Sequence, residues 1–87
     1  MHYVYILRCA DNTLYIGQTA HLKQRLASHM EGTACAFTAR RRPITAAYAE
    51  EHSTKEAALH RERQLKRWTR AKQEALIEGD WQVLKRL

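Results

Sequence analysis

The chain has 87 residues and a formal net charge of +6, with 28% charged residues. A chain of this length buries roughly 60 to 65% of its unfolded surface, so we expect one domain over residues 1–87 with a single modest core. The positive charge favours a polyanionic partner, and because no apolar run is long enough to enter a bilayer, we expect nucleic acid rather than a membrane. Two cysteines and no signal-like N-terminus predict a cytoplasmic location and no disulfide framework.

Two short apolar runs, at residues 3–9 and 14–17, are joined by a polar connection. Aromatic and β-branched residues alternate between the two faces of the first run, which is typical of a strand. Asp11 and Asn12 suit a tight corner because their side chains can hydrogen-bond nearby backbone groups. These features together predict a β-hairpin.

Each predicted strand has a tyrosine near its middle, Tyr5 and Tyr15, and the second strand ends at Gly17. A glycine at a strand end indicates close approach of another group, a bulge or a positive φ. We interpret this combination of two tyrosines and a glycine as part of a functional site.

An amphipathic helix is predicted next, with Thr19 as its N-cap and its end near Gly32. One face of it recurs at spacings of three and four residues: Leu22, Arg25, Leu26 and His29. Arg25 and His29 lie one turn apart on that face, so both border the surface that must face the sheet. They are either functional groups of one site or residues whose stems cover apolar surface while their heads reach water.

Residues 31–42 show no clear period and predict a loop, which ends in Arg40, Arg41 and Arg42. Each guanidinium offers a planar fork of donors, so we expect these arginines to contact phosphate groups of nucleic acid. A charge run that is merely solvated is the alternative.

Residues 44–51 alternate imperfectly and predict a third strand. Ser53 and Glu56 then form a capping-box pattern, which opens a helix running to about Trp68. A hairpin and one further strand form a sheet too small to be stable alone, so helices must cover it.

A last helix is predicted over residues 70–78, capped by Thr69 and ended by Gly79. The tail can pack back through its apolar residues, Trp81, Val83 and Leu84. The pattern as a whole predicts an α/β fold, with a small three-stranded, mainly antiparallel sheet flanked by three helices.

Basic side chains outnumber acidic ones on the last two predicted helices, so the strongest positive field is expected there. The residues expected to contact nucleic acid in this region are Lys66, Arg67, Arg70 and Lys72.

Glu62 lies in the apolar stripe of the helix that follows the third strand. An uncompensated buried carboxylate is costly or becomes protonated, so this position requires a partner. The partner is either an arginine, for instance Arg25, or a divalent cation.

The ordered set of motifs resembles the GIY-YIG nuclease superfamily, specifically its small stand-alone bacterial members, over nearly the whole chain. The residues that carry the resemblance are Val4-Tyr5, Tyr15-Ile16-Gly17, Arg25, His29 and Glu62. Tyr3 stands where the superfamily often has glycine, and Gln18 stands where some relatives carry a lysine.

The resemblance implies a metal-dependent endonuclease that hydrolyses phosphodiester bonds, with DNA favoured over RNA and a role in repair or recombination. It implies that Tyr5, Tyr15, Arg25, His29 and Glu62 are catalytic and that Glu62 binds Mg²⁺ or Mn²⁺. Arg25 would clamp a phosphate oxygen, and Tyr5 and His29 would act together as the base, with Arg25 or the metal lowering the pKa of the tyrosine.

Two other classes of function fit the composition. A basic module that binds nucleic acid without cutting it is the main alternative, and an assembly domain for another protein is the third. The structure of the substrate and the oligomeric state stay open at the level of the sequence.

Overall fold

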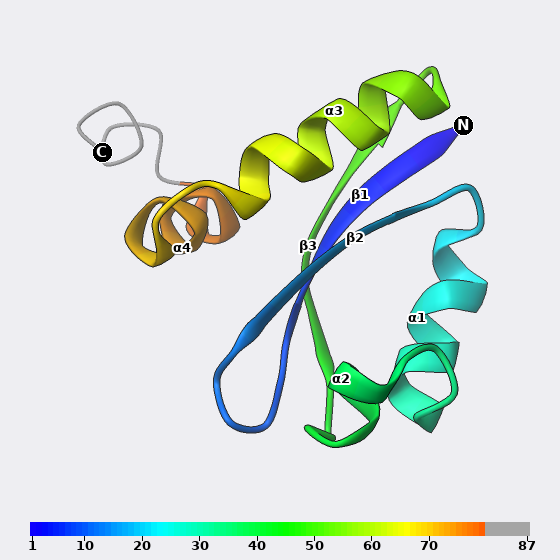
Figure 1. The fold of residues 1–87 in the computed structure, drawn as a ribbon, viewed down its shortest axis with the longest axis vertical. Coiled ribbons are helices and arrows are strands. Elements are labelled where there is room, and N and C mark those ends of the chain that lie inside the picture. Colours follow the sequence, from blue (N-terminus) through cyan, green and yellow to red (C-terminus); the bar gives the residue numbers. More distant parts are fainter. Residues whose placement is uncertain (80–87) are drawn as a thin grey trace.

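The computed structural model describes residues 1–79, which form a three-stranded antiparallel sheet with the strand order β2-β1-β3 (Figure 1). The strands are β1 (His2–Arg8), β2 (Leu14–Thr19) and β3 (Thr45–His52). The helices are α1 (Leu22–Glu31), α2 (Ala36–Ala39), α3 (Lys55–Lys66) and α4 (Arg70–Glu78). The predicted α/β class and the antiparallel sheet are therefore confirmed. The predicted packing of the tail residues Trp81, Val83 and Leu84 lies outside the described residues.

The hairpin turns where its polar residues predict. Asn12 has a φ of 70°, a left-handed conformation that asparagine tolerates well. The Asp11 carboxylate accepts hydrogen bonds from the backbone N–H of Thr13 at 3.1 Å and from its hydroxyl at 2.6 Å. This turn fixes the register of β1 and β2, in which Tyr5 lies directly opposite Gly17.

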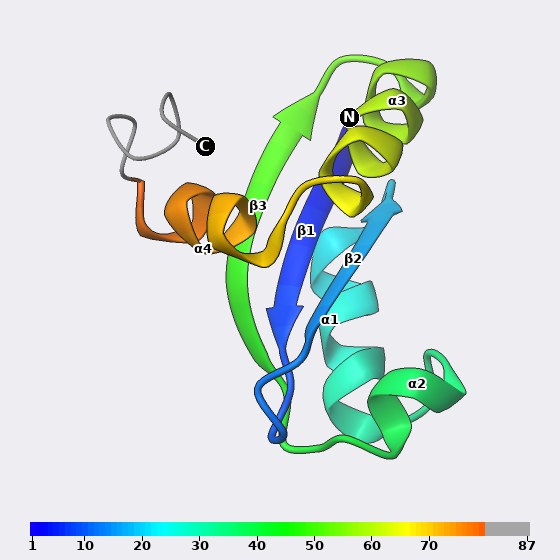
Figure 2. The same ribbon diagram turned by 60° about the vertical axis from the view of Figure 1, so that its left-hand side comes forward.

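The central strand β1 separates two small cores. Its Tyr5 and Leu7 side chains pack towards α1, whereas Val4 and Ile6 pack towards α3. Figures 1 and 2 show α1 and α2 on one face of the sheet and α3 and α4 on the other. Alternation along one strand thus gives each face its own apolar contacts, as period two requires.

The structure has a fourth helix, α2, within the segment predicted to be a loop. Its four residues are too few to leave a helical period in the sequence. The helix buries Thr38 completely, and the Thr38 hydroxyl contacts His29 of α1. A contact between distant residues therefore orders this segment, and the prediction of three helices is wrong by one.

Two predicted N-caps are also wrong by one or two residues. The N-cap of α1 is His21, while the hydroxyl of Thr19 accepts a hydrogen bond from the His21 backbone N–H at 3.0 Å. The N-cap of α3 is Thr54 rather than Ser53, and its hydroxyl accepts from the Ala57 N–H at 3.1 Å. Thr54 has the extended backbone that a cap requires, whereas His21 precedes α1 without a side-chain cap.

The glycine helix ends and the cap at Thr69 are confirmed, whereas α3 ends at Lys66, two residues before the predicted end near Trp68. Gly32 and Gly79 end α1 and α4 in the left-handed conformation, with φ of 84° and 73°. The Thr69 hydroxyl caps α4 by accepting from the Lys72 N–H at 3.2 Å. Within residues 1–79, no helix is long and apolar enough to cross a membrane.

Polar contacts fasten the second layer of helices to the sheet. The Arg8 guanidinium of β1 donates to both carboxylate oxygens of Glu74 on α4, at 2.6 and 2.9 Å. Arg70 donates to the same carboxylate at 2.9 Å. On the neighbouring part of this face, Glu50 of β3 accepts from Arg61 of α3 at 3.0 Å. These contacts hold α3 and α4 against the strands.

Candidate active site

Tyr5 lies at the centre of the candidate site, on β1 and only 1% exposed. Its ring lies across the backbone of Gly17, because a Cβ built on Gly17 would be 2.5 Å from the Tyr5 hydroxyl oxygen. Such a contact is impossible without movement of the buried ring. Of the three reasons that predict a glycine here, close approach of another group is the one that the structure shows.

A chain of hydrogen bonds runs from Tyr5 into the protein. The Tyr5 hydroxyl contacts His29 Nε2 at 2.9 Å, and His29 Nδ1 contacts the Thr38 hydroxyl at 2.8 Å. Beyond it, the Thr38 oxygen lies 3.5 Å from the backbone carbonyl oxygen of Cys35. Tyr5, His29 and Thr38 are all almost completely buried, so these bonds are shielded from water. The structure therefore brings together the two residues predicted as the base.

Tyr15 lies beside this chain, one strand away on β2. Its ring centroid is 6.4 Å from that of Tyr5, 5.1 Å from that of His29 and 5.7 Å from that of Phe37 on α2. Phe37 is 39% exposed, so it forms the outer edge of this aromatic group. The arrangement places both motif tyrosines around one imidazole.

Burial sets the protonation of the site. It raises the pKa of Tyr5 above 10, although the neighbouring Arg25 charge partly opposes the rise. Burial, followed by the contact with Cys35, raises the pKa of Tyr15 to about 12. Burial, helped by the charge of Arg25, lowers the pKa of His29 below 6.5. The phenols are therefore protonated and the imidazole is neutral at pH 7, and the expected net lowering of the tyrosine pKa by Arg25 is not found.

Arg25 borders the site from α1. It is exposed to solvent, and its charge acts on the pKa values of Tyr5, Tyr15 and His29. Arg25 was expected either to belong to the site or to cover apolar surface while its charged head reaches water. The structure shows a solvent-accessible head and also a position near the motif tyrosines.

Glu62 comes from the opposite layer, on α3, and its negative charge raises the pKa of Tyr5. Its side chain is 17% exposed, and its Oε2 lies 3.2 Å from Lys66 Nζ one turn along the helix. In the part of the chain that the structure describes, the ion pair of Glu62 is thus with Lys66 and not with Arg25. The reason is local, because positions i and i+4 of one helix are neighbours.

An open hollow of about 330 Å³ joins the two layers at the edge of β2. Its lining comes from β2, α2, α3 and α4: Leu14, Tyr15, Ile16, Phe37, Lys66 and Gln73. Tyr15 of the buried aromatic group and Lys66, the partner of Glu62, therefore line the same hollow. A substrate lying over this sheet edge would reach both.

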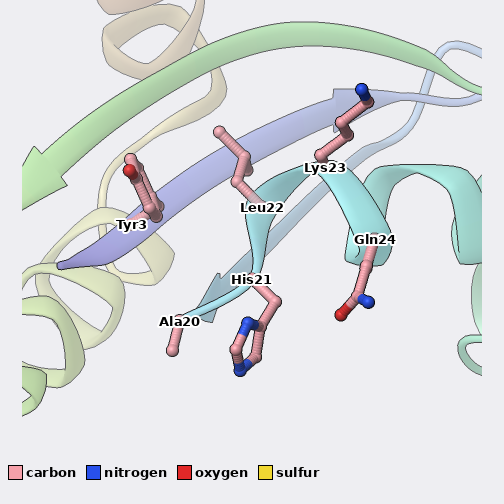
Figure 3. A pocket seen from close by; sticks show the side chains of 6 residues that line it. All are labelled: Tyr3, Ala20, His21, Leu22, Lys23 and Gln24. Carbon is pink, nitrogen blue, oxygen red and sulfur yellow. The ribbon is translucent and has the colours of Figure 1, made fainter.

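A second hollow, of about 420 Å³, lies where β2 leads into α1 (Figure 3). Figure 3 shows its lining side chains, which come from the start of β1, the connection after β2 and the first turn of α1: Tyr3, Ala20, His21, Leu22, Lys23 and Gln24. Tyr3 is two residues before Tyr5 on the same strand, so this hollow lies along the sheet from the candidate site.

Residues 1–79 contain no cluster of three His, Cys, Asp or Glu side chains that could hold a metal ion. A single carboxylate is nevertheless sufficient for Mg²⁺, which keeps several waters and takes the remaining oxygens from phosphates. Glu62 fits that donor set, because it is a partly buried carboxylate next to the site and its paired oxygen leaves the other carboxylate oxygen for a ligand. Glu62 is the residue that would hold such an ion.

The three arginines before Pro43 have uneven surroundings. Arg41 donates to the Phe37 carbonyl at 2.9 Å and lies over the Phe37 ring at 3.8 Å from its centroid. Arg42 donates to the Glu31 carbonyl at 3.1 Å, and both Arg40 and Arg42 are exposed. Arg41 and Arg42 thus order the segment around α2, and contact of any of the three with phosphate stays a prediction.

The basic residues of α3 and α4 are also partly engaged. Lys66 pairs with Glu62, Arg70 pairs with Glu74, and Lys72 Nζ lies 4.7 Å from the centroid of the Trp68 ring. The remaining predicted contact, Arg67, is exposed on the surface. Trp68 itself is half-buried against the core.

The sequence did not indicate three residues that complete the surroundings of the site. They lie in the segment predicted as a loop: Cys35, Phe37 and Thr38. Periodicity could not detect them because α2 has only four residues. A signal was nevertheless available, since Phe37 and Thr38 interrupt a stretch of small and basic residues.

The fold and the site define a small α/β domain with a tyrosine–histidine centre beside a central strand. A family model described as the GIY-YIG catalytic domain matches residues 1–75. The chain therefore belongs to the GIY-YIG family, a nuclease superfamily, and the resemblance stated from the motifs is confirmed.

Its relatives are UPF0213 proteins, which are small single-domain members of this superfamily. A UPF0213 protein of Natronomonas pharaonis is 42% identical over 79 residues, covering 91% of this chain and 93% of that one. A UPF0213 protein of Bacillus pumilus is 43% identical over 77 residues, covering 88% and 79%. The solution NMR structure of a UPF0213 protein from Bacillus halodurans is 31% identical with a TM-score of 0.59, covering 99% and 95%.

Proposed function

We propose that this protein is an endonuclease that hydrolyses phosphodiester bonds in nucleic acid with the help of Mg²⁺ or Mn²⁺, with DNA the substrate to test first. The observation that carries the proposal is the buried hydrogen bond of 2.9 Å between the Tyr5 hydroxyl and His29 Nε2, within reach of the Arg25 and Glu62 charges. A merely structural tyrosine does not require a neutral imidazole as its partner.

The Tyr5–His29 pair supplies the base. A free tyrosine has a pKa of about 10 and is ionised in only about one molecule in a thousand at pH 7, and burial raises the pKa of Tyr5 further. The hydroxyl therefore acts as a relay: its oxygen takes a proton from the attacking water while its own proton passes to His29 Nε2. A neutral imidazole is required for this step, and the lowered pKa of His29 provides it at pH 7.

Arg25 and Tyr15 act on the phosphate and the water. The exposed Arg25 guanidinium can donate two parallel hydrogen bonds to a nonbridging phosphate oxygen pair. Tyr15, with a pKa of about 12, stays a neutral donor that orients the water or the phosphate. A divalent cation held by Glu62 would, when bound, neutralise the scissile phosphate and stabilise the leaving oxygen.

The net charge of +6 supports a polyanionic substrate. Arg25 is exposed beside the motif tyrosines, Arg40 and Arg67 are also exposed on the surface, and Lys66 lines the hollow at the edge of β2. These groups would hold the backbone of the nucleic acid and leave the choice of sequence to other contacts. Action in repair or recombination would follow if branched DNA proves to be the preferred substrate.

The test is cleavage of labelled single-stranded, duplex, flapped and branched DNA and RNA with Mg²⁺, with Mn²⁺ and with EDTA. The natural protein is compared with Glu62→Gln, which removes the charge and keeps the shape. The matched control is Glu56→Gln, an exposed carboxylate on the same helix. We expect metal-dependent cutting that falls at least about 100-fold in Glu62→Gln and is unaltered in the control.

The alternative function is a basic module that binds nucleic acid without cutting it. It becomes the better account if every substrate stays intact while the natural protein and Glu62→Gln bind with equal affinity. Binding that only follows phosphate contacts should weaken linearly with log salt and show no preference for a nucleic acid structure.

A further inference from the structure

We infer that Thr38 is a positioning residue, which fixes the proton of His29 on Nδ1 and so leaves Nε2 bare to accept the proton of Tyr5. The inference rests on the proposed function for its role in catalysis, whereas the tautomer itself is a property of the folded protein. Thr38 is 0% exposed and lies 9 residues after His29, in a helix with no other contact to the imidazole nitrogens.

The proton count at the Tyr5 end gives the direction of the chain. Arg25 can only donate to the Tyr5 oxygen, because a guanidinium has no acceptor. In the part of the chain that the structure describes, His29 Nε2 at 2.9 Å is therefore the acceptor available to the Tyr5 hydroxyl proton. If Nε2 carried a proton instead, it would donate to the Tyr5 oxygen, and the Tyr5 hydroxyl proton would have no acceptor among the side chains of residues 1–79.

A neutral imidazole that is bare at Nε2 must be protonated at Nδ1, which then donates to Thr38 at 2.8 Å. Thr38 can accept this bond because its own proton has two acceptors on the far side. They are the Cys35 carbonyl oxygen at 3.5 Å and the Cys35 sulfur at 3.4 Å. All three hydroxyl and imidazole groups can thus be satisfied in one direction, from Tyr5 through His29 and Thr38 to Cys35.

The hydrogen bond at one ring nitrogen decides which tautomer a histidine adopts. Threonine is suited to the task here, because its hydroxyl can turn to donate towards Cys35 while a lone pair faces His29. The segment around α2 therefore does more than close the chain between α1 and β3. It also places the Thr38 hydroxyl against His29 Nδ1, although this segment has no helical signal in the sequence.

The experiment measures the tautomer directly, by two-bond proton–nitrogen NMR of the ¹⁵N-labelled natural protein at mildly alkaline pH. His29 is assigned from a His29→Asn sample. We expect a protonated Nδ1 and a bare Nε2, which resonate far apart. Because this measurement needs no substitution at Thr38, it stays decisive even if a Thr38 variant does not fold.

Two variants then test the cause. Thr38→Val removes the hydroxyl with little change of volume, and we expect it to lose the Nδ1–H signature and to cut about 10- to 100-fold more slowly. Thr38→Ser restores the hydroxyl, and we expect it to keep the natural tautomer and to cut within about threefold of the natural rate. A merely structural threonine would show no such link between tautomer, rate and rescue.

The inference is overturned by a natural protein that carries its proton on Nε2. It is also overturned by a Thr38→Val protein that is folded and keeps the Nδ1–H tautomer. A natural protein that cuts no substrate, yet shows the Nδ1–H tautomer and its loss in Thr38→Val, would refute the proposed nuclease and leave the positioning role of Thr38 supported.

Discussion

Both faces of the sheet hold polar side chains, but the kinds of polar group differ. On the face covered by α1 and α2, the neutral groups of Tyr5, His29 and Thr38 are each no more than 1% exposed. On the face covered by α3, the Glu50 carboxylate is 17% exposed and its partner Arg61 is 22% exposed. Neutral groups are fully buried on one face, and charged groups stay in contact with water on the other.

The difference follows from the free energy of desolvation. A hydrogen-bonded neutral hydroxyl or imidazole can be buried at small cost, whereas a charge taken wholly out of water is repaid only by excellent pairing. A neutral imidazole at the end of the chain can also accept a proton, which a charged imidazolium cannot. The neutral groups of the first face are therefore suited to proton transfer, whereas on the second face the Glu50–Arg61 contact holds α3 against the sheet.

The sharpest test of the difference between the two faces removes one tyrosine hydroxyl from each of them. Tyr5→Phe should cut about 100- to 10,000-fold more slowly, because it removes the relay between water and His29. Tyr48→Phe should cut at the natural rate, although the Tyr48 hydroxyl donates to Glu50 at 2.7 Å on the other face. Initial cleavage rates and urea unfolding of both variants measure the two effects.

Each of these variants should lose about 1 to 2 kcal/mol of stability, because each leaves a partner without its hydrogen bond. Equal losses of activity in the two variants would show that the faces do not differ in function.

Substitution of Gly17 tests the packing between the backbone of β2 and the Tyr5 ring. Gly17→Ala would place a Cβ 2.5 Å from the Tyr5 hydroxyl oxygen, so we expect the ring to shift and its bond to His29 to break. The free energy of unfolding should fall by about 1 to 3 kcal/mol, as for other overpacked cores. Cleavage should fall at least about 10-fold, because small misplacements of catalytic groups are costly.

Gly79→Ala is the matched control for Gly17→Ala. A Cβ there meets nothing within 4 Å, but the φ of 73° is unfavourable for alanine. We expect lower stability with natural activity. Unaltered cleavage by Gly17→Ala would mean that the position of the Tyr5 ring is not critical.

The smallest effect is expected on the charged face. Glu74, held by Arg8 and Arg70, has its pKa lowered from 4.5 to about 2. The charged form therefore stabilises the fold above pH 4.5, and this contribution is lost as the pH falls from 4.5 towards 2. Because the carboxylate is 27% exposed, Glu74→Gln should reduce stability at pH 7 by only about 1 kcal/mol.

Urea unfolding at several pH values would check this prediction. The difference in free energy of unfolding between the natural protein and Glu74→Gln should shrink below pH 4.5. The cleavage rate of the variant at pH 7 should match that of the natural protein. A difference that does not depend on pH would show that the Arg8–Glu74 pair does not stabilise through its charge.

Much of the fold could be predicted because its signals are local. The alternation before the Asp11-Asn12 corner predicts the hairpin, and Gly32 and Gly79 mark the ends of their helices. Two caps differ from the prediction, because the N-cap of α1 is His21, two residues after Thr19, and α3 is capped by Thr54 next to Ser53. Boundaries of this kind depend on backbone geometry that composition does not specify.

The sequence by itself indicated which residues form the candidate site: the two tyrosines, Gly17, and the histidine one turn after Arg25. Strand and helix periods place each of these residues on a known face of its element. Only the tertiary structure decided which of these groups meet. The Tyr5–His29 bond joins residues 24 positions apart, and the Arg8–Glu74 bond joins residues 66 apart. Such contacts arise when the layers pack, so no local pattern in the chain reports them, and for the same reason Thr38 was found only in the folded protein.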